Sequence, residues 1–400
     1  MHIISREILR EKLKKDVANL CKKLFSTLFM ACIFISFLES PINVCAAQDE
    51  LSLSAQSAVV ICADTGEVIY GKNQNEKRPM ASTTKILTSL LALEAAESCD
   101  REVTITDKMV PVEGSSMYLQ LGQKLPLTSL AKGMLTVSGN DAANSVAIFL
   151  GGSVEGFAKL MNEKAKQIGM NNTNFVTPSG LDAENHYSTA YDMALLGAYA
   201  LENQSFYDIC SKRKVDVPFI EPCEIRTLYN ENRLLKRYDG CIGIKTGFTK
   251  RSGRCLVSGA ERNRCRLVAV TLNAGDDWND HEKLLDYGFL KVESVPLDEC
   301  ECMSLPLVGG NVDEITVFAK DDMNLTLLKG QKDKIEKVVK APQFVYAPIE
   351  KGKVIGKIEY KFEGKIIATN DLIVSTDENI FKENKNLVSK IIGFFKGFFN

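Results

Sequence analysis

Three short motifs contain the residue types that acyl transfer through a serine requires. They are Ser82-Thr83-Thr84-Lys85, Ser138-Gly139-Asn140 and Lys245-Thr246-Gly247. The Ser-x-x-Lys spacing alone is weak evidence, because it recurs at Ser129 and at Ser211. Only the motif at Ser82 is followed by the single Ser-x-Asn and then by the single Lys-Thr-Gly of the chain. This order and spacing indicate one catalytic site.

Ser82 is the predicted nucleophile and Lys85 is the base that activates it. The apolar, helix-forming residues 86–93 follow Pro79 and predict a helix that begins near Ser82, which places Lys85 on the same helix face. A serine hydroxyl reacts poorly until a base takes its proton, and a buried lysine near a second cation can be neutral enough to do so. We assign Lys245 as that second cation. The Ser82 N–H at the helix start is one expected oxyanion donor.

Ser138 and Asn140 occupy a predicted turn ahead of an alanine-rich helix. We expect Ser138 to relay a proton toward the leaving amine. The amide of Asn140 can donate to a substrate carbonyl and also hold Lys85 by hydrogen bonding. Taken alone, this turn is more typical of an ordinary helix cap.

Residues 242–249 have the composition of a β-strand. We expect Lys245 and Thr246 to bind a carboxylate. Gly247 leaves room for an extended peptide along the strand edge, and the Phe248 N–H is the second expected oxyanion donor. Without the other two motifs, an edge strand with an exposed lysine is the better interpretation.

With these motifs the chain resembles the serine-type D-alanyl-D-alanine carboxypeptidases, which are low-molecular-mass penicillin-binding proteins. The resemblance covers nearly the whole chain, including residues 73–85, residues 177–182, Tyr191-Asp192, residues 240–249 and a β-rich second domain. It implies an α/β fold like that of the serine β-lactamases, with an antiparallel sheet flanked by helices. It also implies that the enzyme removes the terminal D-alanine from peptidoglycan stem pentapeptides, and that β-lactams acylate Ser82.

The family's roles transfer to four matching positions. The resemblance implies that Ser82 is the acyl-ester nucleophile, Lys85 the proton acceptor, Ser138 the proton relay and Lys245 the carboxylate binder. Neither a metal ion nor an organic cofactor is expected. After Ser82 has been acylated, we expect water to hydrolyse the acyl-enzyme, with Lys85 again as the base.

Three alternatives compete with this function. A β-lactamase with these motifs needs a Glu-x-x-Leu-Asn loop, and none occurs between Ser138 and Lys245. A D,D-endopeptidase that cuts cross-links would use the same motifs. A non-hydrolytic penicillin-binding scaffold would bind cell-wall peptides without turnover.

Both ends of the chain predict a membrane-related location. Basic residues precede an apolar run at 24–38 and then Val44-Cys45-Ala46-Ala47, which is typical of a secretory signal peptide, although an uncleaved anchor is the alternative. Near the C-terminus, apolar residues fall on one side of a helix and lysines on the other. We predict that this amphipathic helix holds the secreted enzyme on the outer face of the cytoplasmic membrane, rather than docking on the protein itself.

The sequence predicts that the whole chain divides into four parts. We assign residues 1–47 to the signal peptide, 48–294 to the catalytic domain, 295–376 to a small all-β domain and 377–400 to the membrane-anchor helix. The predicted strands of the catalytic domain lie in the hairpin 57–70 and at 241–249, 255–259 and 266–273, and its clearest helices lie at 153–168, 189–201 and 281–290. The predicted strands of the β-domain lie at 315–318, 325–328, 343–348, 354–362 and 365–374.

Composition excludes several other classes. The net charge of −2 and the absence of a basic stripe argue against a nucleic-acid partner. The chain has only three histidines, which argues against a histidine metal site and against a Ser-His triad. We interpret His186 as a surface-loop residue rather than a residue of the cleft. Nine of the twelve cysteines follow Ala47 without a Cys-x-x-Cys pair, so no disulfide framework can be assigned.

Overall fold

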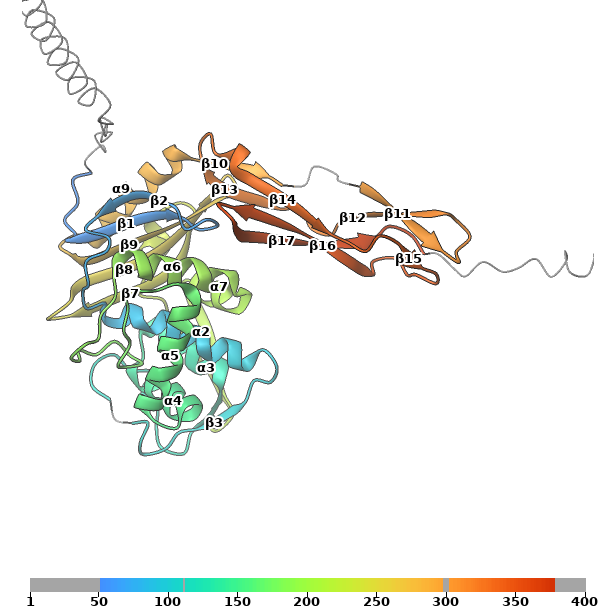
Figure 1. The fold of residues 1–400 in the computed structure, drawn as a ribbon. Coiled ribbons are helices and arrows are strands. Elements are labelled where there is room, and N and C mark those ends of the chain that lie inside the picture. Colours follow the sequence, from blue (N-terminus) through green and yellow to red (C-terminus); the bar gives the residue numbers. More distant parts are fainter. Residues whose placement is uncertain (1–50, 111, 298–301, 378–400) are drawn as a thin grey trace, which may run out of the picture. The chain divides into compact units, whose positions relative to one another are not determined.

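A five-stranded antiparallel sheet forms the centre of the catalytic region in the computed structural model (Figure 1), which describes residues 51–110, 112–297 and 302–377. Its strand order is β2-β1-β9-β8-β7. The strands are β1 (Ser57–Cys62), β2 (Val68–Lys72), β7 (Cys241–Thr249), β8 (Gly253–Arg262) and β9 (Cys265–Ala274). The predicted signal peptide and all but the first residue of the predicted anchor helix lie outside the described residues.

Helices cover both faces of this sheet. Val59 and Ile61 of β1 join one hydrophobic cluster, whereas Ala58 and Val60 join another, because neighbouring side chains of a strand point to opposite faces. The first cluster includes residues of α6 (Ala190–Glu202), and the second includes residues of α9 (Asp277–Lys291). Both faces of the sheet are therefore buried.

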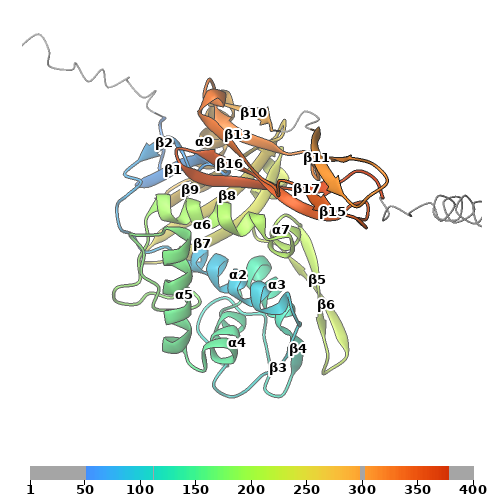
Figure 2. The same cartoon turned by 45° about the vertical axis from the view of Figure 1, so that its right-hand side comes forward.

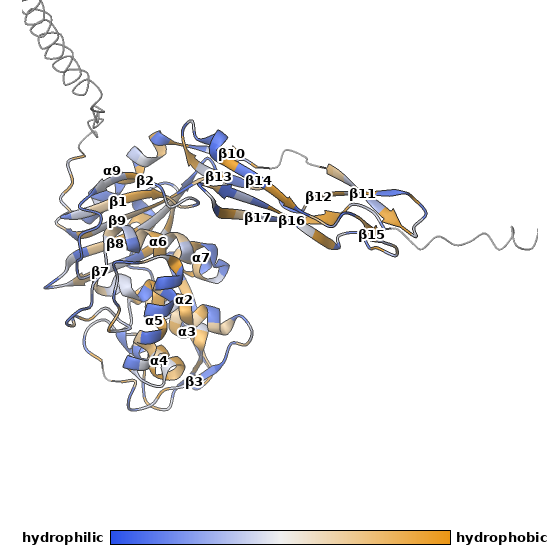
Figure 3. Cartoon of the chain, viewed as in Figure 1, coloured by the Kyte–Doolittle hydropathy of each residue, from blue (hydrophilic) through white to orange (hydrophobic). Residues whose placement is uncertain are grey.

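A mainly helical region lies beyond α6 and carries part of the site (Figure 2). It consists of the 3-10 helix η1 (Ala81–Thr84), α2 (Lys85–Ala96), α3 (Leu127–Val137), α4 (Asn140–Gly151) and α5 (Val154–Ile168). Hydrophobic residues concentrate on α3 and α4, whereas α5 has a hydrophilic exposed side (Figure 3). Helix α5 begins where Ser153 accepts a hydrogen bond from the Gly156 N–H, because serine favours this position at a helix start.

Short elements complete the catalytic region. They are the pair β3 (Glu102–Thr104) and β4 (Lys124–Pro126), the hairpin β5 (Lys214–Phe219) and β6 (Glu224–Tyr229), α7 (Gln204–Cys210) and α8 (Leu234–Arg237). Among the described residues, no helix is long and apolar enough to cross a membrane.

The second region is all β. Its six-stranded sheet has the order β14-β16-β17-β12-β11-β15, and β10 (Val292–Pro296) pairs with β13 (Asn324–Leu328). The other strands are β11 (Cys302–Val308), β12 (Glu314–Ala319), β14 (Ile335–Lys340), β15 (Val345–Tyr346), β16 (Val354–Phe362) and β17 (Lys365–Val374). Thr326 of β13 connects this region to the catalytic region, because its N–H donates to Asp64 and its hydroxyl accepts from the Arg266 N–H.

The structure confirms the predicted hairpin at residues 57–70, the three later strands of the catalytic region and the helices at 153–168 and 189–201. The prediction was incomplete, and it missed the short strands β3, β4, β5 and β6 of the catalytic region. Helix α9 begins at Asp277 rather than at residue 281, since acidic residues occupy its first turn and favour a helix N-terminus. Strands β10, β11 and β14 were not predicted, and β10 spans the predicted domain boundary at 294/295.

Candidate active site

Ser82 and Lys85 meet at the junction of η1 and α2. The Lys85 Nζ donates to the Ser82 Oγ at 2.9 Å and to the Ser179 carbonyl at 2.7 Å. The residue before Ser82, Ala81, has a φ of 48°, which is uncommon for a residue with a side chain. The backbone is thus bent where the serine enters the helix, and the serine hydroxyl lies against the amine.

Burial, and then the positive charge of Lys245, hold the pKa of Lys85 well below its usual range. Lys85 is fully buried, so its ammonium form has lost water. Burial also lowers the pKa of Lys245 to about 8, and the carboxylate of Glu231 opposes this effect on both lysines. Lys245 therefore keeps its charge more readily than Lys85, and Lys85 is the better proton acceptor.

Strand β7 lies directly against η1. A Cβ on Gly247 would lie 3.0 Å from the Ser82 N and 3.1 Å from the Thr83 N, so a side chain there would crowd the nucleophile's backbone. The Lys245 Nζ donates to the Thr246 carbonyl at 3.1 Å and, more weakly, to its hydroxyl at 3.4 Å. Lys245 is buried, while the Phe248 side chain is exposed.

Ser138 follows α3 with a left-handed backbone, at a φ of 61°. The turn that follows Ser138 holds the loop that contains Ser115, since the Asn140 N–H donates to the Ser115 carbonyl at 2.7 Å. Asp141 accepts the N–H groups of Met117 and Leu119, both at 3.0 Å. Asp141 thus acts as an anchor for the loop that carries Ser115.

One predicted interaction of Asn140 is wrong. Its Nδ2 donates to the Glu113 carbonyl, and its Oδ1 is buried without a hydrogen-bond partner among the described residues. It does not hold Lys85, because Ser82 and the Ser179 carbonyl accept from that amine instead. The sequence could not reveal this, since the loop from Glu113 reaches Asn140 only in the folded chain.

Ser179 and Gly180 contribute backbone rather than side chain to the site. Gly180 has a φ of +82°, and a Cβ there would lie 1.8 Å from the Ala81 carbonyl oxygen. Only glycine permits this approach, which places the Ser179 carbonyl on Lys85. The Pro178-Ser179-Gly180 stretch is visible in the sequence, but its contact with Lys85 is not.

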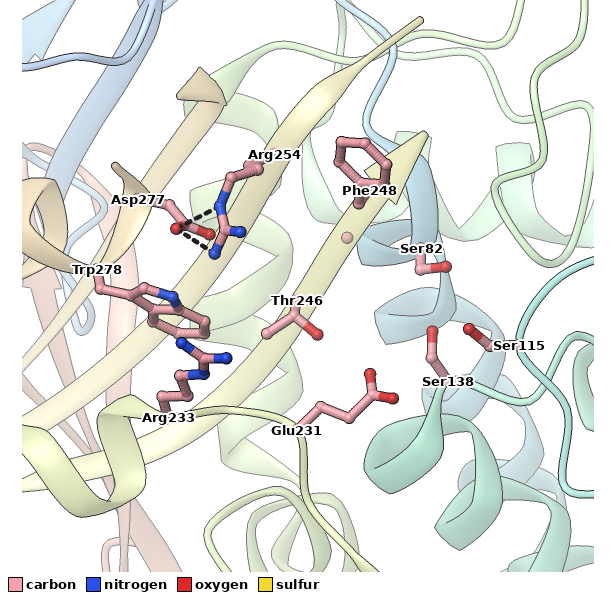
Figure 4. A pocket seen from close by; sticks show the side chains of 11 residues that line it. Ser82, Ser115, Ser138, Glu231, Arg233, Thr246, Phe248, Arg254, Asp277 and Trp278 are labelled. Carbon is pink, nitrogen blue, oxygen red and sulfur yellow. Dashed lines mark hydrogen bonds and ion pairs between the residues drawn. The ribbon is translucent and has the colours of Figure 1, made fainter. Parts of the chain in front are cut away.

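A cleft of about 310 Å³ lies beside Ser82 and Ser138 (Figure 4). Of the residues predicted from the sequence, the cleft is lined by Ser82, Ser138, Thr246, Gly247 and Phe248. Six further residues line it and were not predicted from the sequence: Ser115, Glu231, Arg233, Arg254, Asp277 and Trp278. The two lysines and Asn140 do not line the cleft.

His186 is buried, so its interpretation as a surface residue was wrong. Its Nδ1 accepts from the Val176 N–H at 2.9 Å, and its Nε2 lies 3.0 Å from the Thr84 Oγ1. Nε2 therefore carries the hydrogen, and burial lowers the pKa of His186 to about 4. Within the described residues, no cluster of three or more histidine, cysteine, aspartate or glutamate side chains could hold a metal ion.

Comparisons with known proteins match both regions of the chain. Residues 43–276 match the family described as D-alanyl-D-alanine carboxypeptidase, and residues 300–379 match the family described as penicillin-binding protein 5, C-terminal domain. The chain is 33% identical over 379 residues to the D-alanyl-D-alanine carboxypeptidase DacF of Bacillus subtilis (strain 168), which covers 89% of this chain and 94% of that protein.

Two solved structures are also similar. Penicillin-binding protein 5 from Haemophilus influenzae aligns with a TM-score of 0.58 and 30% identity, over 83% of this chain and 99% of that one. Penicillin-binding protein D2 from Listeria monocytogenes, in its ampicillin-bound form, aligns with a TM-score of 0.54 and 33% identity, over 60% of this chain and all (100%) of that one.

Proposed function

The chain belongs to the D-alanyl-D-alanine carboxypeptidase family, and from this premise we propose that Ser82 is the nucleophile with which it removes a terminal D-alanine. The protein is a serine-type D-alanyl-D-alanine carboxypeptidase with a penicillin-binding, β-lactamase-like α/β domain and a C-terminal β domain. The observation that carries the assignment of Ser82 is the 2.9 Å contact between its Oγ and the buried amine of Lys85.

In the first step, Lys85 takes the proton of Ser82, and the serine oxygen attacks the carbonyl of the penultimate D-alanine. Burial removes water from the Lys85 ammonium group, and the charge of Lys245 repels it. Both effects favour the neutral amine that this step needs. The backbone N–H groups of Ser82 and Phe248 stabilise the oxyanion that forms. This role agrees with the close approach of β7 to η1 at Gly247.

In the second step, the amide bond breaks and Ser138 passes a proton to the departing D-alanine. Thr246 binds the terminal carboxylate directly, and Lys245 contributes its positive charge through its contact with the Thr246 hydroxyl. Asn140 acts through the backbone, because its N–H holds the loop that carries Ser115 at the edge of the cleft. Water then hydrolyses the ester with Lys85 as base, which releases the shortened stem peptide of peptidoglycan.

The assignment of Ser82 is tested by β-lactam acylation. Ampicillin should add its mass to the protein once, on the peptide that contains Ser82, and Ser82→Ala should abolish the adduct. Ser211→Ala is the matched control, because Ser211 starts another Ser-x-x-Lys sequence. An adduct that persists in Ser82→Ala and maps elsewhere would refute the assignment.

We further propose the four-part organisation of residues 1–47, 48–294, 295–376 and 377–400 as signal peptide, catalytic domain, β-domain and anchor. On this proposal the enzyme is secreted, and the last segment lies on the outer face of the cytoplasmic membrane. Its lysines lie at anionic headgroups and its phenylalanines at the interface. Deletion of residues 378–400 should abolish sedimentation with anionic vesicles. Unchanged sedimentation would contradict the anchor.

A further inference from the structure

One edge of the six-stranded sheet in the all-β region carries an exposed apolar patch. Strand β15 forms this edge and pairs in parallel with β11, so that Val308 and Tyr346 lie side by side (Figure 1). These two side chains are 46% and 65% exposed, whereas those of Leu307 and Val345 are buried, since side chains alternate between the two faces of a strand. Phe344 is 44% exposed and contacts Tyr346 edge to face, with 5.3 Å between the ring centres. We call Val308, Phe344 and Tyr346 the edge patch.

The two segments that form the edge patch contain no charged residue. Residues 303–312 and 341–349 have no aspartate, glutamate, lysine or arginine, although 25% of the residues in the whole chain are charged. Surfaces that face only water usually carry charges of both signs. The composition therefore indicates that the edge patch contacts something other than water.

The charges around the edge patch nearly balance. The charged residues that flank the two segments, or that bond to those flanking residues, are Asp313, Glu314, Lys340, Glu350, Lys351, Lys353, Lys357, Glu359 and Asp377. Acidic residues slightly outnumber basic ones in this set, so the border of the patch does not attract an anionic surface. Any attraction at the patch is therefore apolar and depends little on salt.

The described part of the chain ends close to the edge patch. The Lys351 N–H donates to the Asp377 carboxylate at 2.7 Å, and the turn that contains Lys351 directly follows the uncharged segment 341–349. Val374, at the end of β17, belongs to the same hydrophobic cluster as the buried neighbours of the patch in β11 and β15. Residues 378–400, which lie outside the described residues, therefore begin at the end of the sheet that carries the patch.

The sequence after Asp377 favours a lipid surface as the partner of the edge patch. Residues 378–400 are the segment that we propose lies on the membrane. Its first apolar residues, Ile380 and Phe381, follow Asp377 within four residues, which span at most ~14 Å when fully extended. A segment bound to the membrane thus keeps this end of the sheet near the headgroups. Tyrosine and phenylalanine suit that position, because their rings are apolar and the tyrosine hydroxyl can stay in water.

The edge around the patch is poorly suited to a partner strand from another protein. Strand β15 has only two residues, and Pro342 and Pro348, which lack N–H groups, lie on either side of it. The Ala347 N–H already donates to the Val308 carbonyl at 3.0 Å. Strand addition needs a longer row of backbone donors and acceptors. The contact has to be made by side chains, as at a lipid surface.

We propose that the edge patch is a second membrane contact, at which Val308, Phe344 and Tyr346 enter the interface of the lipid surface that the last segment reaches. This inference rests on the proposed anchor at residues 377–400. The two contacts differ in kind, because the lysines of the last segment bind headgroup charge, whereas the patch buries apolar side chains. Two contacts fix the orientation of the all-β region on the membrane, which one tether does not.

Vesicle binding at two salt concentrations tests the edge patch. Replacing both Phe344 and Tyr346 with serine should weaken binding to phosphatidylglycerol–phosphatidylcholine vesicles about tenfold, because apolar burial is lost. The factor should be the same at about 0.1 M and at about 1 M salt, since the lost term is not electrostatic. The matched control replaces Ile225 and Tyr229 of β6, which are 69% and 70% exposed, with serine and should bind like the unchanged protein.

Equal binding by the edge-patch variant and the unchanged protein would overturn the proposal, and so would an equal loss in the control. A loss that disappears at the higher salt concentration would also overturn it. Failure of the proposed anchor would appear separately, as binding that survives the deletion of residues 378–400.

A fluorescence test identifies what covers the edge patch. Tyr346→Trp adds a second tryptophan there, besides Trp278, which is 8% exposed. Vesicles that contain brominated lipid should quench this variant more than the unchanged protein, and the control Tyr229→Trp should show no such increase. Without vesicles, iodide should quench the added tryptophan. Protection from iodide that ends when residues 378–400 are deleted would show that this segment covers the patch, and would overturn the proposal.

Discussion

At the scale of single residues, the site depends on two buried lysines that carry different protonation states. Lys85 is surrounded by protein and lies near a second cation, so its neutral form is favoured. Lys245 keeps its charge at neutral pH, because burial lowers its pKa only to about 8. The base and the carboxylate-binding charge can therefore lie near each other without exchanging roles.

Replacing Lys245 should change the pH dependence of acylation. Lys245→Met removes the cation that disfavours protonated Lys85, so the pKa of Lys85 rises and less neutral base is present at a given pH. The acid limb of the pH–rate profile for acylation by ampicillin should move to higher pH by about one unit. The measured quantity is the pH at the midpoint of the acid limb. Weaker binding of ampicillin by the variant changes mainly the height of the profile and not this midpoint.

Glu231→Gln provides the control of opposite sign. The Glu231 carboxylate raises the pKa of both lysines, so its loss should move the acid limb to lower pH. The shift should be smaller, because Glu231 is exposed to solvent. Shifts of the same sign in the two variants would show that charge does not set the limb.

The residues predicted from the sequence are those of the three short motifs, whose residue types and order carry a signal of their own. Ser82 and Lys85 are three residues apart, so helical geometry alone brings them together. Ser115, Glu231 and Trp278 carry no local signal, because separate loops and the start of α9 bring them to the cleft. The missing Asn140–Lys85 contact has the same origin, since a distant carbonyl competes for the amide.

At the scale of elements, the nucleophile is positioned by three segments that touch closely. Strand β7 approaches η1 at Gly247, and the loop at Gly180 approaches the Ala81 carbonyl. Ala81 itself has a left-handed backbone, which costs about 1 kcal/mol or more and persists only because its neighbours hold it. The geometry of Ser82 is therefore a property of the assembled segments.

Gly180→Ala should disrupt this assembly. The new methyl carbon would meet the Ala81 oxygen at 1.8 Å, so one of the two segments has to move. We expect the free energy of unfolding to fall by clearly more than the ~1 kcal/mol that a left-handed alanine costs, and acylation to slow by at least about 100-fold. Urea unfolding and ampicillin acylation measure these effects.

Gly330→Ala is matched to this substitution in backbone geometry. Gly330 has a φ of +83°, against +82° for Gly180, but nothing lies within 4 Å of its added Cβ. It should therefore show only the backbone cost and normal acylation. Equal destabilisation by the two substitutions would mean that the contact with Ala81 does not matter.

Elements with strong periodicity or clear turn residues were predictable, and strands that contain a proline or bury few side chains were not. The hairpin at β1 and β2 has a turn with glycine, and α5 has its serine cap. Strand β11 contains Pro306, which makes a run look less like a strand, although the strand forms. Strand β14 is largely exposed, so its residues show little hydrophobic alternation.

At the scale of the whole molecule, stability depends on two histidines that are buried in their neutral form. His186 bridges Thr84 to the strand-like segment at Val176, and His281 lies between the hydroxyls of Ser258 and Thr271. Burial lowers the pKa of His186 to about 4 and that of His281 to about 3. Both side chains must gain a proton when the protein unfolds in mild acid.

Stability should therefore decline as the pH falls from about 6.5 toward 4. Above that window each histidine is neutral in both states, whereas within it the unfolded chain binds more protons and unfolding is favoured. For His186 the loss is at most about 3 kcal/mol, from a change of the pKa from 6.5 to about 4. Free energies of unfolding in urea at several pH values measure it.

His186→Gln separates this effect from the titration of carboxylates. Glutamine retains hydrogen-bonding groups but does not titrate, so the variant should be less stable at neutral pH and depend less steeply on pH below 6.5. An unchanged slope would show that His186 is already protonated in the folded protein.

The most direct measurement is the time course of D-alanine release from diacetyl-Lys-D-Ala-D-Ala by the full chain and by its Ser82→Ala variant. The account predicts steady release by the first and none above background by the second, with both proteins folded. Release that persists in Ser82→Ala, or no release by a folded protein that ampicillin acylates, would contradict a carboxypeptidase that works through Ser82.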